Sequence, residues 1–117
     1  MTESKEAVKI AVHALEDKKG EQIKIIDISN ISVIADYFII ASGRNANQIK
    51  AMADEVDEKL GKAGIEPKQI EGYSGAKWIL MDYRDFIIHI FNEEERLYYD
   101  IERIWSDGKN VDLDSLK

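Results

Sequence analysis

The chain has 117 residues, a length typical of one domain and sufficient to bury a single hydrophobic core without disulfides or metal ions. It contains no cysteine, which excludes disulfides, iron–sulfur clusters, Cys-ligated zinc and cysteine nucleophiles. Its 23 acids outnumber its 16 bases and the bases are scattered, so direct binding to nucleic acid is disfavoured. A formal charge of −7 instead favours encounter with a basic partner, such as a ribosomal or chromatin protein.

The N-terminal sequence MTESKEAV has no basic segment followed by an apolar core, as a secretory signal would have. No apolar run approaches the ~20 residues that a transmembrane helix needs. We therefore expect an intracellular, cytoplasmic and soluble protein without a membrane partner.

The first predicted element is an amphipathic helix that Thr2 or Ser4 can cap and that ends at residues 18–20, Lys-Lys-Gly. Two strands are predicted next, at residues 22–28 and 36–42. The second of these, DYFIIAS, is apolar on both faces over most of its length, which is typical of a central strand.

A second helix is predicted after Gly43 and ends at Gly61 and Gly64, before Pro67. Its apolar residues recur at helical spacing: Ile49, Met52, Ala53, Val56 and Leu60. A short third strand at residues 67–72 is followed by a predicted hairpin of 78–82 and 86–91.

The last predicted helix begins at Asn92, a capping residue, and its first turn carries three glutamates. Its predicted inner face comprises Leu97, Tyr98, Ile101, Ile104 and Trp105. We predict one domain over residues 1–106 and a polar, mobile tail over 107–117. The fold class is α+β, with a mixed sheet of about five strands and three main helices.

Two features of the sequence resemble parts of enzyme sites, and each also has a structural explanation. Ser42-Gly43 precedes a helix start, where backbone N–H groups favour anions, but the P-loop and dinucleotide-binding patterns are absent. A tight strand-to-helix turn is the simpler interpretation. Close acid pairs lie in helices or in the tail instead of two residues apart on one strand, so a two-metal site lacks its ligands. A nucleotide-binding protein that uses the Ser42-Gly43 turn remains the alternative function.

His89 lies in the predicted strand FIIHIF and could serve as a base, a metal ligand or a pH-sensitive group. No nucleophile is linked to it by sequence. The alternative is a strand histidine whose ring hydrogen-bonds a nearby carboxylate or carbonyl. We predict no catalytic residue, metal or cofactor.

Trp78, Leu80 and Asp82 are predicted to project from one side of their strand, and Ile79 and Met81 from the other. If helices cover both faces of the sheet, Trp78 is a core residue. If one face is open, Trp78 and nearby Tyr83 would anchor a protein interface, because Trp and Tyr often dominate binding energy there. Asp82 and Asp85 would give such an interface an acidic rim.

Four segments resemble the ribosomal silencing factor family, also called Iojap-like: ADYFIIASG, EGYSGAKWILMDY, DFIIHIF and EERLYYDIERIW. Their order and spacing match over about residues 5–106. The resemblance implies a fold related to nucleotidyltransferases without their catalytic carboxylates. It also implies binding to the large ribosomal subunit through its fourteenth protein, and obstruction of small-subunit joining when nutrients are scarce. Self-association off the ribosome is a further expectation.

Carried over by position, the family's tryptophan, aspartate and strand histidine are Trp78, Asp82 and His89. The expected contact surface comprises Trp78, Leu80, Met81, Asp82 and Tyr83, and the secondary candidates are Asp36, Tyr37, Asp85 and His89. Arg84 departs from the family pattern, in which glycine is common, so the turn conformation is open.

Overall fold

A computed structural model describes residues 2–112 of the chain. The helices and strands of this part are α1 (Thr2–Asp17), β1 (Glu21–Asp27), β2 (Tyr37–Gly43), α2 (Ala46–Lys62), β3 (Gln69–Glu71), β4 (Trp78–Asp82), β5 (Phe86–Asn92), α3 (Glu93–Tyr99), α4 (Ile101–Ile104) and β6 (Lys109–Val111). None of these helices is both long and apolar enough to cross a bilayer.

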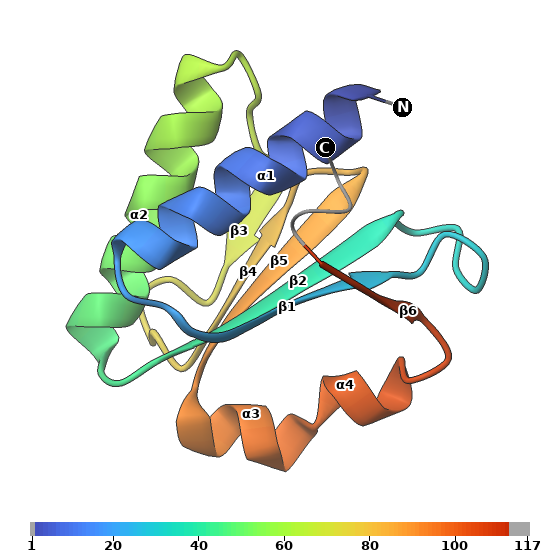
Figure 1. The fold of residues 1–117 in the computed structure, drawn as a ribbon. Coiled ribbons are helices and arrows are strands. Elements are labelled where there is room, and N and C mark those ends of the chain that lie inside the picture. Colours follow the sequence, from blue (N-terminus) through green and yellow to red (C-terminus); the bar gives the residue numbers. More distant parts are fainter. Residues whose placement is uncertain (1, 113–117) are drawn as a thin grey trace.

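The strands form one mixed sheet in the order β3-β4-β5-β2-β1-β6. The central pair, β2 and β5, is parallel, and the other neighbouring strands are antiparallel. Helices α1 and α2 cover one face of the sheet, whereas α3 and α4 lie against the other (Figure 1). This arrangement confirms the predicted α+β class, with a sixth strand added to the five expected.

Strand β2 separates two hydrophobic clusters. Ile39 and Ala41 belong to the larger cluster beneath α1 and α2. Phe38 and Ile40 point the other way, into a smaller cluster that includes Ile101 of α4. Burial on both faces explains why the sequence of β2 is continuously apolar.

Helix α2 confirms the second predicted helix. Asn45 caps it by accepting a hydrogen bond from the Gln48 backbone N–H through its side chain. The last turn carries Lys59 and Lys62, which interact favourably with the C-terminal end of the helix dipole. The predicted apolar residues are all buried: Ile49, Met52, Ala53, Val56 and Leu60.

The third predicted helix is broken at Asp100. Its predicted inner face is confirmed at Ile101 and Trp105, which belong to or pack against the smaller cluster, and is wrong at the other three positions. Asp100 has a φ of 47°, in the left-handed region that Asp tolerates better than most residues, and it separates α3 from α4. The break rotates the chain out of register. Leu97, Tyr98 and Ile104 are therefore 77%, 80% and 69% exposed, although they were expected in the core.

Part of the predicted tail belongs to the sheet. Residues 109–111 pair with β1 in antiparallel register, with Val111 opposite Ile25. Val111 also packs against the cluster under α1 and α2. Pairing of this kind rests on backbone hydrogen bonds, which a polar sequence does not forbid. Residues 113–117 of the predicted tail lie outside the described residues.

Candidate protein-docking site

Strand β4 divides its side chains between the two faces of the sheet. Ile79 and Met81 are fully buried in the cluster under α1 and α2. Trp78, Leu80 and Asp82 point to the opposite face, where they are only partly buried. Helix α3 packs against β5 and β2, so the outer part of this face is open along β4. A cavity of about 300 Å³ lies there, lined by Glu71, Gly72, Trp78 and Leu80.

The Trp78 ring is held by three neighbours. It stacks on Phe91 with a centroid distance of 4.9 Å and packs against Tyr99 of α3 at 4.7 Å. Its Nε1–H donates a hydrogen bond of 3.1 Å to Nδ1 of His89. Trp78 is thus partly a core residue, because its inner side packs against the small cluster, while its outer side lines the cavity. Its role as an interface anchor stays a prediction.

His89 lies beneath the candidate surface instead of on it. The side chain is 5% exposed, and burial lowers its pKa to about 4, so the ring is neutral at neutral pH. Because Nδ1 accepts from Trp78, the neutral ring carries its proton on Nε2, which has no hydrogen-bond partner among the described residues. The predicted carboxylate or carbonyl partner is therefore replaced by an indole, and His89 orients Trp78.

Two residues of the predicted contact surface, Met81 and Tyr83, are buried, which contradicts their prediction as contact residues. Met81 is fully buried because side chains alternate along β4. Tyr83 is 5% exposed and stacks on Phe86, with 5.1 Å between the ring centroids. Burial raises the pKa of the Tyr83 hydroxyl. Neither side chain is accessible to a partner.

Arg84 adopts a positive φ of 74° in the turn that follows β4. Its backbone N–H donates to Oδ1 of Asp82 at 2.8 Å, which holds this carboxylate at the end of the strand. The turn thus keeps the glycine-like conformation without a glycine, and it directs Tyr83 inward.

The secondary candidates Asp36, Tyr37 and Asp85 lie close together at the N-terminal ends of the central strands β2 and β5. The Asp36 backbone N–H donates to the Asp85 carbonyl at 2.7 Å, and the Ser4 hydroxyl donates to the Asp85 carboxylate at 3.2 Å. Tyr37 packs toward the cluster under α1 and α2. Trp78 is paired with Phe91, at the other end of β5, about 16 Å away at ~3.3 Å per residue. The structure therefore separates these three residues from Trp78.

The Ser42-Gly43 turn is filled by protein groups. The Ser42 hydroxyl, 3% exposed, accepts a 2.7 Å hydrogen bond from Arg96. A Cβ on Gly43 would lie 2.7 Å from Cγ1 of Ile49, so glycine is required for close packing of α2. The Arg44 backbone N–H donates to the Gln48 side chain at 2.6 Å. The Ser42 hydroxyl and the Arg44 N–H are thus already used within the fold.

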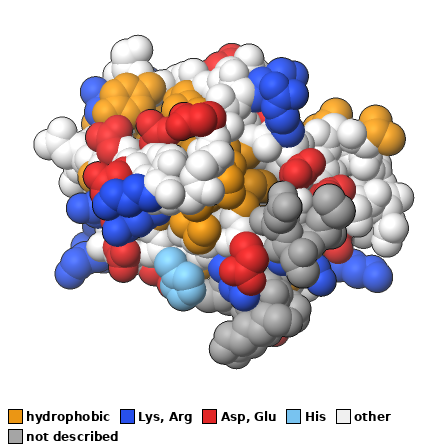
Figure 2. Space-filling view, turned by 90° about the horizontal axis from the view of Figure 1, so that it is seen from above, with side chains coloured by type: hydrophobic (Ala, Val, Ile, Leu, Met, Phe, Trp, Pro, Cys, Tyr) orange, Lys and Arg blue, Asp and Glu red, His pale blue; other side chains and the backbone are white. Residues whose placement is uncertain are grey.

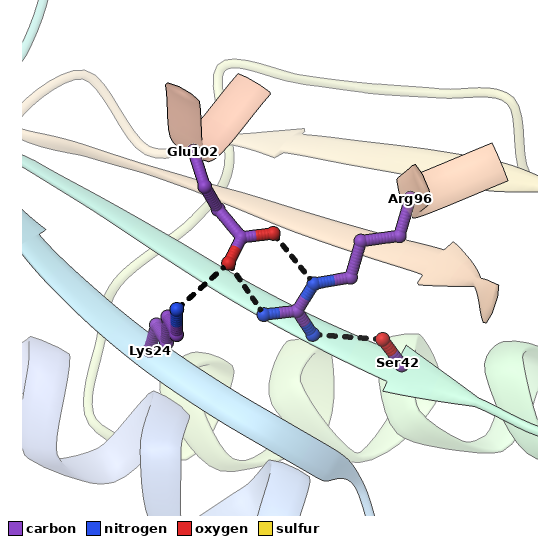
Figure 3. A network of polar contacts seen from close by, with 4 residues as sticks. All are labelled: Lys24, Ser42, Arg96 and Glu102. Atoms are coloured by element: carbon purple, nitrogen blue, oxygen red, sulfur yellow. Dashed lines mark hydrogen bonds and ion pairs between the residues drawn. The ribbon is translucent and has the colours of Figure 1, made fainter. Parts of the chain in front are cut away.

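A polar network joins this turn to the helices below the sheet (Figure 3). Arg96 is 5% exposed and donates to both carboxylate oxygens of Glu102, at 2.8 and 3.2 Å, as well as to Ser42. Lys24 of β1 forms an ion pair with Glu102 at 3.1 Å. The hydrogen bond from Arg96 is the main cause that lowers the pKa of Glu102.

The sequence did not reveal this network. Residues 96 and 102 would project in directions about 120° apart around a continuous helix, because six residues correspond to about 600° of rotation. Only the left-handed residue Asp100 brings the two side chains together. Among residues 2–112, no group of three or more Asp, Glu or His side chains is placed to hold a metal ion.

The side of the molecule seen from above in Figure 2 carries charges of both signs. Lys and Arg side chains are interspersed there with Asp and Glu side chains, and apolar side chains show between them (Figure 2). Mixed charge of this kind is typical of a solvated surface.

Comparison with known proteins identifies relatives over nearly the whole chain. The family model described as "Ribosomal silencing factor during starvation" matches residues 1–117. The ribosomal silencing factor of Bacillus subtilis is 40% identical over 110 residues, which cover 94% of this chain and 93% of that protein. The factor of Halalkalibacterium halodurans is 39% identical over 113 residues, 97% of each chain.

A crystal structure of a protein from Chromobacterium violaceum superposes with a TM-score of 0.85. It is 36% identical in sequence, and the match covers 92% of this chain and 88% of that one. Sequence and fold therefore agree, and the chain belongs to the ribosomal silencing factor family.

Proposed function

We propose that this protein binds the large ribosomal subunit through the subunit's fourteenth protein and blocks joining of the small subunit. Its effect is to repress translation in the cytoplasm under nutrient limitation. The partner is a basic protein at the face where the small subunit docks. No nucleic acid, membrane or cofactor takes part in the recognition.

The observation that carries the proposal is the half-buried Trp78 on the open face of β4. A ring packed on Phe91 and hydrogen-bonded to His89 loses little conformational freedom on binding. Leu80 beside it adds apolar surface, and Glu71 and Asp82 place acids on the same face. Aromatic anchors within a polar rim are typical of binding hot spots.

Blocking of this kind makes and breaks no covalent bond, and we therefore expect no enzymatic activity. A typical interface of ~1,600 Å² reaches micromolar to nanomolar affinity, depending on how well its anchor is buried. The charge of −7 attracts the protein to a basic partner and repels it from ribosomal RNA phosphates. Off the ribosome, the same open face supports weak pairing of two copies, which would compete with subunit binding.

The proposal is tested by Trp78→Ala in a binding titration with the isolated fourteenth protein. The variant should weaken binding by about 2–4 kcal/mol while thermal unfolding remains cooperative. Trp105→Ala is the control, because Trp105 is also partly buried but packs on Phe38 at 5.1 Å, two strands away from β4. Equal affinity of the Trp78 variant and the wild type would remove Trp78 from the contact surface.

A further inference from the structure

Helix α3 exposes apolar and aromatic side chains of the kind that a surface helix usually turns toward the core. Leu97 and Tyr98 are 77% and 80% exposed, and Tyr99 is 43% exposed. The buried residue of α3 is Arg96, so the helix is fastened to the sheet by a charged group instead of an apolar stripe. The exposed side chains are therefore free to serve another contact.

Two of these side chains continue the aromatic surface of β4. The Tyr99 ring packs on Trp78 at 4.7 Å, and the Tyr98 ring meets Tyr99 edge-to-face at 5.0 Å. Trp78, Tyr99 and Tyr98 thus form a continuous row of rings, which we call the aromatic row. It runs from the partly buried strand to the exposed surface of α3.

Leu97 lies on the other side of α3. It lines a cavity of about 530 Å³ together with Gln22, Ile23 and Lys24 of β1. Leu97 and Tyr98 are almost equally exposed on the same helix, yet only Tyr98 belongs to the aromatic row. Substitutions of Leu97 and Tyr98 can therefore probe the β1 side and the β4 side of α3 separately.

The aromatic row is held in place before any partner arrives. Asn92 caps α3 by accepting from the Glu95 backbone N–H at 2.8 Å. One turn later, Arg96 is bound to Ser42 of β2 and to Glu102 of α4. These bonds fix the rotation of α3 about its own axis, and a fixed tyrosine costs less entropy to bury than a mobile side chain.

The charges around the aromatic row define the kind of partner. Glu94 and Glu95, in the first turn of α3, stand four residues before Tyr98 and Tyr99, and Glu71 lines the cavity beside Trp78. Arg96, the basic residue of α3, is buried, and its charge is neutralised by Glu102. A surface of rings with acids on both sides fits a basic protein surface that presents an apolar side chain, and it repels phosphates.

We propose that α3 forms the second wall of the docking surface and that Tyr98 and Tyr99 contact the same basic large-subunit protein as Trp78. This inference rests on the proposed function and extends its surface from the sheet onto the helix. Leu97, on the β1 side of α3, lies outside the contact.

The test is a co-sedimentation titration with salt-washed large ribosomal subunits, using wild type, Tyr98→Ala and Leu97→Ala. Both substitutions remove an exposed side chain, so unchanged thermal unfolding is expected for both. Tyr98→Ala should raise the dissociation constant about tenfold, whereas Leu97→Ala should leave it within about twofold.

Each other outcome has a separate meaning. If Trp78→Ala weakens binding but Tyr98→Ala does not, the second wall is refuted and the proposed function stands. Equal losses for Tyr98→Ala and Leu97→Ala would refute the assignment of one side of α3. A change confined to self-association, measured by sedimentation equilibrium, would make the row a contact between two copies and overturn the inference. If the wild-type protein does not co-sediment with large subunits, the proposed function itself is refuted.

Discussion

At Trp78, one side chain serves both the fold and the proposed surface. The ring is held by stacking on Phe91, by Tyr99 and by a hydrogen bond to His89, while one side lines an open cavity. Its support depends on a neutral His89, since a ring protonated at both nitrogens could not accept from the indole N–H. The orientation of Trp78 is thereby linked to the protonation state of a buried group.

The buried His89 makes stability depend on pH in a defined direction. Its pKa is lowered from 6.5 to about 4 in the folded protein, so the unfolded chain binds a proton between these values and the folded chain does not. The free energy of unfolding should therefore fall as the pH drops from 6.5 to about 4, by roughly 3 kcal/mol.

Denaturant titrations at several pH values measure this effect. His89→Gln removes the titrating group and keeps an acceptor for Trp78, so the fall in unfolding free energy over this range should diminish. The control is His13→Gln, at an exposed position of α1. An unaltered pH profile in the His89 variant would refute the linkage.

At the scale of elements, α3 is the unusual one. Seven residues make a helix that is marginal on its own, and its buried side chain is an arginine. The Arg96 network therefore supplies attachment that an apolar stripe supplies in α2. Loss of Arg96 should release α3 and, with it, the packing of Tyr99 on Trp78.

We expect Arg96→Met to lower the free energy of unfolding by about 1–3 kcal/mol, because it leaves Ser42 and Glu102 without their principal partner. Fluorescence of Trp78 in a Trp105→Phe background reports whether α3 has moved. Arg103→Met is the matched control, since Arg103 forms an exposed ion pair with Asp100 at 3.2 Å, which contributes less than about 1 kcal/mol. Equal effects of the two variants would argue against a special role for the buried network.

The periodic elements of this fold could be predicted from the sequence, and the irregular ones could not. Apolar residues at helical spacing located α2, and a continuous apolar run located β2 at the centre of the sheet. The break at Asp100 left no sequence pattern, because Asp is common within helical segments and in their caps. Strand β6 was missed since its pairing depends on the backbone more than on side chains.

In the candidate site, likewise, the regular strand could be predicted from the sequence and the residues of the turn and of α3 could not. Alternation along β4 correctly placed Trp78, Leu80 and Asp82 on one face, and the same alternation could have excluded Met81. Tyr83 was misplaced because the turn conformation at Arg84 determines its direction. The exposure of Tyr98 depends on the tertiary contact of Arg96 with β2, which no local pattern predicts.

At the scale of the whole molecule, the described residues form a compact body of 33 × 33 × 25 Å. Under the proposed function, a rigid body of this size anchored on the large subunit would exclude the small subunit by its volume. In the proposed function, its net charge of −7 would aid approach to a basic docking site and oppose binding to RNA elsewhere. Affinity and concentration would then determine how many subunits are blocked, and the proposed mechanism requires no catalytic group.

The joining of purified ribosomal subunits tests this account most directly. Large subunits are incubated with increasing protein, small subunits are added, and the fraction of joined ribosomes is followed by light scattering. The account predicts that joining falls in parallel with occupancy of the large subunit, and that Trp78→Ala shifts the effect to higher concentration. Undiminished joining at full occupancy of the large subunit would contradict it.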